Sequence, residues 1–194
     1  GAGFSDSDTV AITVNPVNDA PVAAPASAGG PEDTLLPVTL TASDIDGTVA
    51  SFTVPTLPAD GTLYLDAART IVVIAGTAYA AAANSLTLYF MPDANFNGVT
   101  GFDFIATDDL GMTDGNGATL TITAANDAPV AAPASASGPE DTLLPITLAG
   151  SDVDGPVARF TVQSLPAHGT LYLDAARTTA VLAGTAYAAS GNAL

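Results

Sequence analysis

The stretch GFDFIATDDLGMTDGNGATLTIT, residues 101–123, decides the fold class of this chain. Apolar residues alternate with polar or small residues in its first and last thirds, and a period of two is typical of half-buried β-strands. The same alternation recurs in PVTLTAS (37–43), ASFTVP (50–55) and SLTLYF (85–90). These segments are therefore predicted to be strands, each with one face toward a core.

The segments between the predicted strands are rich in turn-forming residues. They contain DIDG (44–47), PADG (58–61), NFNG (95–98) and DGNG (114–117), and Asp, Asn and Gly favour tight turns. One stretch, TAYAAAANS (77–85), has enough alanine for a helical turn or two. Many short strands with regular turns and no long helix predict an all-β fold, a seven-stranded Greek-key β-sandwich of immunoglobulin-like size.

The chain also contains an internal repeat with a period of 108 residues. Residues 18–86 align with residues 126–194 without an insertion and differ at 16 of 69 positions. Residues 9–21 (TVAITVNPVNDAP) match residues 117–129 (GATLTITAANDAP) in the same phase. A fixed period of this kind indicates tandem copies of one folded unit.

The phase of the repeat divides the chain into three parts. We expect the last strand or strands of a preceding repeat in residues 1–17, a complete repeat in residues 18–125, and the N-terminal part of a following repeat in residues 126–194. A sandwich that lacks strands would expose its core and unpaired edges, so we expect either that the native chain continues or that another copy supplies strands. Gly1 corresponds to Asp109, so a head-to-tail neighbour would still leave the counterparts of residues 87–108 unfilled.

The composition restricts the classes of partner. Eighteen Asp and two Glu stand against three Arg and no Lys, which gives a net charge of -17. Such a surface repels nucleic acid and anionic lipid and attracts cations. No apolar run approaches the roughly 20 residues that span a bilayer. The sequence has no Cys, which excludes disulfides and thiolate metal sites. We expect neither nucleic-acid binding nor membrane insertion.

The acidic residues gather in groups at the ends of the predicted strands. Ca²⁺ takes six to eight oxygen ligands, which short turns can bring together. Asp and Asn also form turns through local hydrogen bonds, which explains any single aspartate equally well. Glutamate is a poor turn former, yet the two glutamates stand at one repeated position, 108 residues apart. The groups in the complete repeat are Asn18 with Asp19, Glu32 with Asp33, Asp44 with Asp46, and Asp108 with Asp109.

These motifs carry a resemblance to a known family. FIATDDLGMTDGNGATLTITAANDAPV (104–130) resembles the end of a cadherin repeat, PED (31–33) resembles the cadherin PE motif, and ASDIDG (42–47) resembles the DxD motif. LPADGTLYLD (57–66) and MPDANFNGVTGFDFIATDDLG (91–111) resemble the bacterial cadherin-like tandem repeats of large secreted adhesins and biofilm proteins. The resemblance implies tandem cadherin-like β-sandwiches at the cell surface with Ca²⁺ bound between successive repeats. The candidate Ca²⁺ ligands that it implies are Asn18, Asp19, Glu32, Asp44, Asp46 and Asp108 in the complete repeat, and Asn126, Asp127, Glu140, Asp152 and Asp154 in the following one. It also implies that Glu32 serves the far junction, with Asn126 and Asp127.

Enzymatic chemistry is not indicated. The single histidine, His168, corresponds to Asp60 in the complete repeat, and the sequence has no G-x-S-x-G motif, histidine cluster or cysteine nucleophile. We expect a non-enzymatic extracellular stalk, stiffened by Ca²⁺, of a surface adhesin or biofilm matrix protein. Its partners would be neighbouring repeats or other copies of the chain, and a cell-surface glycan or protein bound by other regions.

Two alternatives stay open. The first is a subunit of an extracellular filament, in which strands from one copy complete another. The second is a carbohydrate-binding module that uses Tyr64, Tyr79 and their counterparts Tyr172 and Tyr187, although packing in the sandwich is a simpler explanation of these tyrosines.

Overall fold

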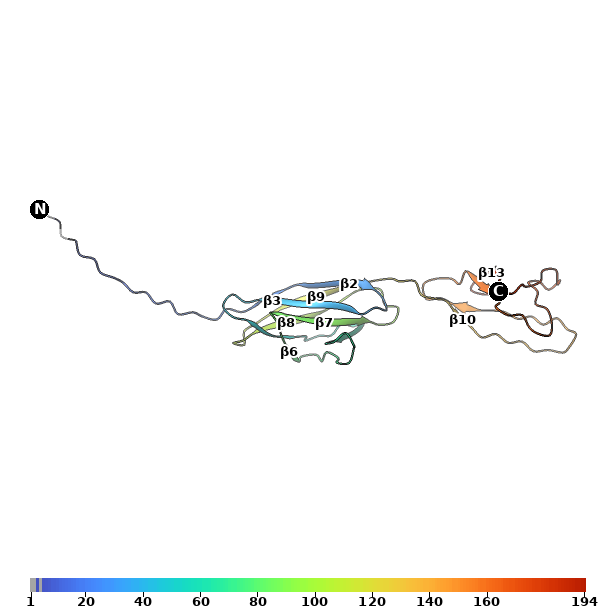
Figure 1. Cartoon of the computed structure of the whole chain (residues 1–194), viewed down its shortest axis with the longest axis horizontal. Helices are drawn as coiled ribbons and strands as arrows, with labels where there is room; N and C mark the ends of the chain where they lie inside the picture. Colours follow the sequence, from blue (N-terminus) through green and yellow to red (C-terminus); the bar gives the residue numbers. More distant parts are fainter. Residues whose placement is uncertain (1–2, 4) are drawn as a thin grey trace. The chain divides into compact units, whose positions relative to one another are not determined.

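The computed structural model describes residues 3 and 5–194 of the chain. Its residues fall into two units, Gly1–Ala124 (unit 1) and Ala125–Leu194 (unit 2). All regular secondary structure in the described residues is β-strand, so the predicted all-β fold is confirmed (Figure 1). No helix in this part of the chain has the length and apolarity that crossing a membrane requires.

Unit 1 is a sandwich of two sheets. The first sheet has the strand order β1-β3-β7-β5, and all its pairs are antiparallel. The second has the order β2-β9-β8-β4-β6 and is antiparallel except for the pair β2–β9, which is parallel. The chain crosses between the sheets from β3 to β4 and from β7 to β8, as in immunoglobulin-like sandwiches. The strands are β1 (Val22–Ala24), β2 (Ala26–Pro31), β3 (Leu36–Ser43), β4 (Val49–Thr53), β5 (Gly61–Tyr64), β6 (Ala78–Ala80), β7 (Ser85–Pro92), β8 (Gly98–Asp108) and β9 (Thr113–Thr123).

The described part of unit 1 has nine strands instead of the predicted seven. The first strand is divided at Pro25 into β1 and β2, which lie in different sheets. Proline has no N–H to donate to a ladder, so the pairing of β1 stops there and the chain changes sheet. The other added strand is β6, a short edge strand that pairs with β4.

The alanine-rich stretch at residues 77–85 forms no helix, and that prediction is wrong. Its first half is β6, and its second half turns into β7 through Ala83 and Asn84, which have positive φ values of 49° and 59°. Helix propensity is a weak preference that tertiary contacts override. Here residues 78–80 form backbone hydrogen bonds with the free edge of β4, and this pairing is preferred to a helical turn of the same length.

The turn between β8 and β9 is also displaced from its predicted position. DGNG (114–117) lies inside β9 and pairs with β8, so the prediction of a turn there is wrong. The chain instead turns at residues 109–112. The Asp108 carboxylate accepts hydrogen bonds from the N–H groups of Leu110 (2.9 Å) and Met112 (2.8 Å), and Gly111 supplies a positive φ of 94°. An aspartate that caps its own turn thus fixes the hairpin.

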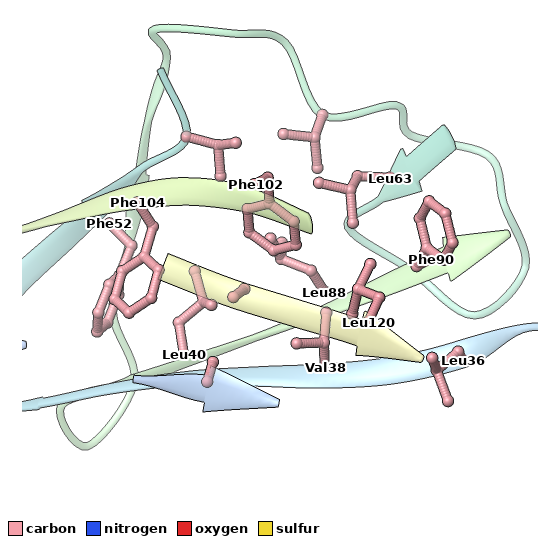
Figure 2. Close-up of a cluster of buried hydrophobic side chains, with 14 of the residues drawn as sticks. Leu36, Val38, Leu40, Phe52, Leu63, Leu88, Phe90, Phe102, Phe104 and Leu120 are labelled. Atoms are coloured by element: carbon pink, nitrogen blue, oxygen red, sulfur yellow. The ribbon is translucent and has the colours of Figure 1, made fainter. Parts of the chain in front are cut away.

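The core of unit 1 lies between the two sheets and is built from the apolar members of the predicted alternation. Phe52 of β4 and Phe104 of β8 are fully buried, with ring centroids 6.0 Å apart and ring planes inclined by 54°. Aromatic pairs favour such tilted arrangements. Figure 2 shows the two rings beside each other, with leucines, Val38 and two further phenylalanines, Phe90 and Phe102, in the rest of the cluster. The other large, fully buried side chains are Pro21, Val38, Leu40, Val54, Leu63, Val73, Leu88, Phe90 and Leu120.

Unit 2 repeats part of this architecture. Its strands are β10 (Val130–Ala131), β11 (Gly150–Ser151), β12 (Arg159–Thr161) and β13 (Ala186–Ala188). The antiparallel pairs β10–β11 and β12–β13 are the counterparts of β1–β3 and β4–β6. Its buried hydrophobic residues are Val157 and Val181, and Val181 lines an apolar groove with residues of the connections between the strands, among them Leu148 and Leu171. The counterparts of β8 and β9, which close the core of unit 1, do not occur in residues 125–194.

The described residues before β1, residue 3 and residues 5–21, form no strand. A single strand needs a neighbouring strand to hydrogen-bond with. The assignment of residues 1–17 to the end of a preceding repeat therefore stays a prediction.

Candidate functional site

Acidic side chains gather at the end of unit 1 where the chain enters the sandwich. This end, the N-terminal pole, consists of the entering segment 18–21, the β3–β4 connection (44–48) and the β8–β9 turn (109–112). It brings together five of the six candidate ligands of the complete repeat, namely Asn18, Asp19, Asp44, Asp46 and Asp108. The sixth, Glu32, lies elsewhere.

Asp108 is buried and joins the entering segment to the β8–β9 turn. The Asn18 side-chain amide donates a hydrogen bond of 2.8 Å from Nδ2 to Asp108 Oδ2. The other carboxylate oxygen, Oδ1, accepts the two backbone hydrogen bonds of the turn. Both oxygens are thus engaged within the protein, and the geometry gives Asp108 a structural role at the pole.

These hydrogen bonds make the stability of unit 1 depend on pH. The Asn18 amide, followed by the N–H groups of Met112 and Leu110, lowers the pKa of Asp108 below its usual 3.8, against the opposing effect of burial. A carboxyl with a lowered folded-state pKa contributes stability that is complete above its unfolded-state pKa and is lost as the pH falls through the folded-state value. We expect Asn18→Ala to lower the melting temperature of unit 1 at pH 7 and to weaken its fall below about pH 4, measured by circular dichroism from pH 7 to pH 2.

The matched control is Asn126→Ala. Asn126 is the counterpart of Asn18, but its side chain donates to the backbone oxygen of Asp127 in unit 2. This substitution should leave the unfolding of unit 1 unchanged at every pH. Melting curves of Asn18→Ala and the unchanged protein that run parallel down to pH 2 would show that the Asn18–Asp108 hydrogen bond does not set the pH dependence.

Asp44 and Asp46 hold the β3–β4 connection and meet the entering segment. The Asp19 N–H lies 3.3 Å from both carboxylate oxygens of Asp46. Asp44 Oδ1 accepts hydrogen bonds from the N–H groups of Asp46 (3.2 Å) and Gly47 (3.0 Å), which is an Asx turn. Asp44 Oδ2 is buried and accepts no hydrogen bond from the described residues. A buried carboxylate oxygen without a donor is costly unless a cation or water meets it.

Asp109 is the residue of this pole that the candidate ligand set omits. A Cβ atom placed on Gly47 would lie 2.7 Å from Asp109 Oδ1 and 3.3 Å from Asp44 Oδ2. The two carboxylates therefore face each other across the space that glycine leaves, and Asp109 Oδ1 also accepts a 3.3 Å hydrogen bond from Thr48 N–H. The adjacent Asp108–Asp109 pair is visible in the sequence. Whether Asp108 or Asp109 faces Gly47 depends on the position of the β8–β9 turn. The sequence pattern predicted that position wrongly.

Glu32 lies at the opposite end of β9 from the N-terminal pole. Its N–H donates a 2.9 Å hydrogen bond to Thr123 O, where the β2–β9 pair ends, and its side chain is only 2% exposed. Asp33, with φ of 58°, and a hydrogen bond from Thr34 Oγ1 to Pro31 O form the tight turn that places it. Glu32 is thus separated from Asn18 and Asp19 and lies beside the segment that leaves unit 1.

Unit 2 reproduces the inner part of the N-terminal pole. The Asp127 N–H donates to the Asp154 carboxylate, and Asp154 N–H donates to Asp152 Oδ1 at 3.1 Å, as their counterparts do in unit 1. The turn that holds Glu140 also repeats that of Glu32, with Asp141 at φ 58°. Glu140 itself is exposed, whereas Glu32 is buried.

The oxygen donors at the pole are of the class that Ca²⁺ prefers, but they are not arranged as a closed site. Among residues 3 and 5–194, no group of three or more His, Asp or Glu residues is arranged so that it could hold a metal ion. The carboxylates of Asp46 and Asp108 accept N–H donors instead. The features that fit a cation are the buried Asp44 Oδ2 and the space at Gly47 between Asp44 and Asp109.

Two of the four candidate tyrosines form hydrogen bonds within their own units. The hydroxyl oxygens of Tyr79 and Tyr187 accept 2.7 Å hydrogen bonds from the backbone N–H groups of Ile74 and Leu182. This is the packing role that offered the simpler explanation of these tyrosines. His168 is exposed in a connection of unit 2.

The sandwich of unit 1 matches a known protein family. A family model described as a bacterial Ig domain matches residues 18–123. Among solved structures, a conjugative transposon lipoprotein from Bacteroides eggerthii is similar, with 10% sequence identity and a TM-score of 0.37, over 54% of this chain and 95% of that chain. No curated protein matches the sequence.

Proposed function

Because the chain belongs to the bacterial Ig domain family, we propose that it serves as a non-enzymatic extracellular stalk, built from tandem cadherin-like sandwiches and stiffened by Ca²⁺. The observation that carries the proposal is the recurrence of one carboxylate arrangement at the entry of both units. Asp19, Asp46 and Asp44 are linked in unit 1 as Asp127, Asp154 and Asp152 are linked in unit 2. A carboxylate arrangement that recurs at the entry of each unit is expected for a function that every repeat performs.

The charge of the pole explains why a cation would stiffen it. With a net charge of -17 and four aspartates in its connections, the pole of unit 1 repels itself. The residues that would hold Ca²⁺ are Asp44 and Asp109, and the ion would neutralise the negative charge of the pole, to which Asp19 and Asp46 also contribute. The entering segment is joined to the pole through Asn18 and Asp19. Neutralisation would therefore fix the segment against the sandwich and limit its bending.

Calcium removal tests the proposal. Extracellular modules bind Ca²⁺ with a Kd of roughly 10⁻⁴ to 10⁻³ M, so 10 mM Ca²⁺ should stabilise unit 1 by about 1.4–2.7 kcal/mol through mass action. For a domain of this size that is a rise in melting temperature of roughly 6–20 °C. Small-angle scattering should show a larger maximum dimension in Ca²⁺ than in EDTA. A melting temperature and maximum dimension that are the same in both buffers would contradict the proposal.

A glycine substitution distinguishes stabilisation by a bound ion from stabilisation by general screening of the charges. Gly47→Ala removes no charge, but its Cβ would occupy the space between Asp44 and Asp109. It should abolish most of the Ca²⁺-dependent rise in melting temperature. The counterpart substitution Gly155→Ala meets no atom within 4 Å in unit 2 and should leave the rise intact. If Gly47→Ala keeps the full rise, the ion does not bind between Asp44 and Asp109.

A further inference from the structure

The outer face of the first sheet, the side away from the core, carries two tyrosines on adjacent strands. The register pairs Tyr64 of β5 with Tyr89 of β7. Their neighbours along the strands, Leu63, Leu88 and Phe90, are buried in the core, so both tyrosines point outward, and both are partly exposed. Side chains directly opposite in an antiparallel pair have Cβ atoms about 4.5–5.5 Å apart. The two rings are therefore neighbours on the surface.

The tyrosine pair belongs to a row that crosses the sheet. Pro37 of β3 pairs with Tyr89 on one side, and Val72 of the β5–β6 connection pairs with Tyr64 on the other. Pro37 is exposed, and Val72 is 49% exposed. Four neighbouring segments at the usual strand spacing give a row about 14 Å long. Contiguous apolar and aromatic surface of this kind commonly marks a binding site.

The rest of this face carries hydroxyl groups and no charge. Thr62 lies opposite Met91 on one side of the row. On the other side Thr39 lies opposite Thr87, with the two hydroxyl oxygens 3.1 Å apart. The chain has 20 acidic residues, yet the outward-facing residues of β3, β5 and β7 are all uncharged. They are Pro37, Thr39, Thr41, Ser43, Thr62, Tyr64, Ser85, Thr87, Tyr89 and Met91.

Tyr64 and Tyr89 differ from the tyrosine that the fold uses. Tyr79 packs against the core, and its hydroxyl accepts a hydrogen bond from Ile74 N–H. The hydroxyls of Tyr64 and Tyr89 form no hydrogen bond with any residue that the structure describes. Their hydroxyl groups and ring edges are therefore available to a ligand.

We propose that the outer face of the first sheet binds a neutral polysaccharide, an extended β-linked glucan chain that lies along the row from Pro37 to Val72. The C–H groups on the face of a sugar ring pack against the electron-rich face of an aromatic ring. The sugar hydroxyls then exchange hydrogen bonds with the tyrosine and threonine hydroxyls beside the row. A flat row suits an extended glycan chain, and a few polar groups fix its orientation.

The charge of the chain selects against anionic glycans. Binding of a sulfate, phosphate or carboxylate group favours a cationic side chain, and the outward-facing residues of β3, β5 and β7 include none. The net charge of -17 also repels an anionic polymer. A neutral polysaccharide meets neither obstacle. This glycan-binding function would be added to the stalk function and would not involve the N-terminal pole.

Affinity gel electrophoresis of the full chain tests the proposal. Hydroxyethyl cellulose in the gel should retard the chain increasingly as its concentration rises. Carboxymethyl cellulose has the same glucan backbone with anionic groups, and it should bind at least about fivefold more weakly. With EDTA present throughout, failure of the Ca²⁺ proposal cannot produce failure here. Equal retardation by the two polymers, or no retardation by hydroxyethyl cellulose, would overturn the proposal.

Substitutions on the face test the role of the two rings. Tyr64→Ala and Tyr89→Ala should each weaken binding to hydroxyethyl cellulose by about fivefold or more, because each removes a stacking surface. Tyr89→Phe keeps the ring and should retain most of the binding. The control Thr41→Ala lies at the far end of the same face and should bind as the unchanged chain does. Melting curves check that each variant is folded.

Two results with these variants would contradict the proposal. One is unchanged binding in folded Tyr64→Ala and Tyr89→Ala. The other is concentration-dependent association of the chain that Tyr89→Ala abolishes, in place of polysaccharide binding, because a second copy would then be the occupant of this face.

Discussion

Replacing Phe52 with alanine is expected to lower the free energy of unfolding of unit 1 by about 3–5 kcal/mol. Phe52 is completely buried between the sheets and packs against the Phe104 ring at 6.0 Å between centroids. Its loss removes apolar contact area and leaves a cavity that the surrounding strands cannot fully fill. Urea denaturation followed by circular dichroism, with amide hydrogen exchange on peptides from β8 and β9, measures the change.

The repeat supplies a matched control for this prediction. Phe160 is the counterpart of Phe52, but it is only half-buried in unit 2. Phe160→Ala should leave hydrogen exchange in β8 and β9 unchanged. A loss below about 1 kcal/mol for Phe52→Ala would mean that the Phe52–Phe104 pair is not the centre of the core.

Gly61→Ala is expected to destabilise unit 1 by about 2–4 kcal/mol, since it combines overpacking with an unfavourable backbone conformation. A Cβ at this position would overlap Met91 O and would lie 2.6 Å from Cζ of the buried Phe90 ring. The clash involves backbone and core atoms, so neither can move without disturbing the β5–β7 pair. The melting temperature of the full chain measures the effect.

Gly169→Ala controls for the glycine itself. Gly169 is the counterpart of Gly61, also has a positive φ, and its Cβ would meet no atom within 4 Å. Any loss in unit 2 should then reflect the backbone conformation alone. Equal losses for the two substitutions would show that the contact with Met91 and Phe90 contributes nothing.

The alternation in residues 101–123 predicted the fold class correctly because it reflects which face of each strand is buried. The position of the turn was missed because it depends on Asp108, whose carboxylate caps residues 110 and 112. The turn-forming DGNG sequence is strong locally, yet ladder pairing with β8 keeps it extended. At residues 114–117 pairing with β8 therefore outweighs the local turn preference.

The repeat shows that strand formation does not depend on the local sequence alone. ASAGGP (26–31) forms β2, whereas the nearly identical ASASGP (134–139) forms no strand. The first segment pairs with β9, whereas no strand among the described residues pairs with the second. Turns behave differently, since Asp33 and Asp141 share a φ of 58°. Short turns follow from their own residues, and strand pairing follows from distant ones.

The candidate site was predictable in part for the same reason. Asn18, Asp19, Asp44 and Asp46 converge as expected because they lie in short connections at one end of adjacent strands. The separation of Glu32 from Asn18 and Asp19 follows from the length of the parallel β2–β9 pair, and the expectation that Glu32 serves the far junction with Asn126 and Asp127 stays a prediction. The roles of Gly47 and Asp109 could not be predicted from the sequence. The space that Gly47 leaves is significant only because the fold brings the carboxylates of Asp44 and Asp109 to either side of it.

The most direct test of the central claim is a high-resolution crystal structure of the full chain grown with Ca²⁺. Our account predicts an ion at the N-terminal pole, with oxygen contacts of about 2.3–2.6 Å that include Asp44 Oδ2 and Asp109. A structure in which Asp44 Oδ2 meets only water or an N–H donor at saturating Ca²⁺, with no ion at the entry of either unit, would contradict it.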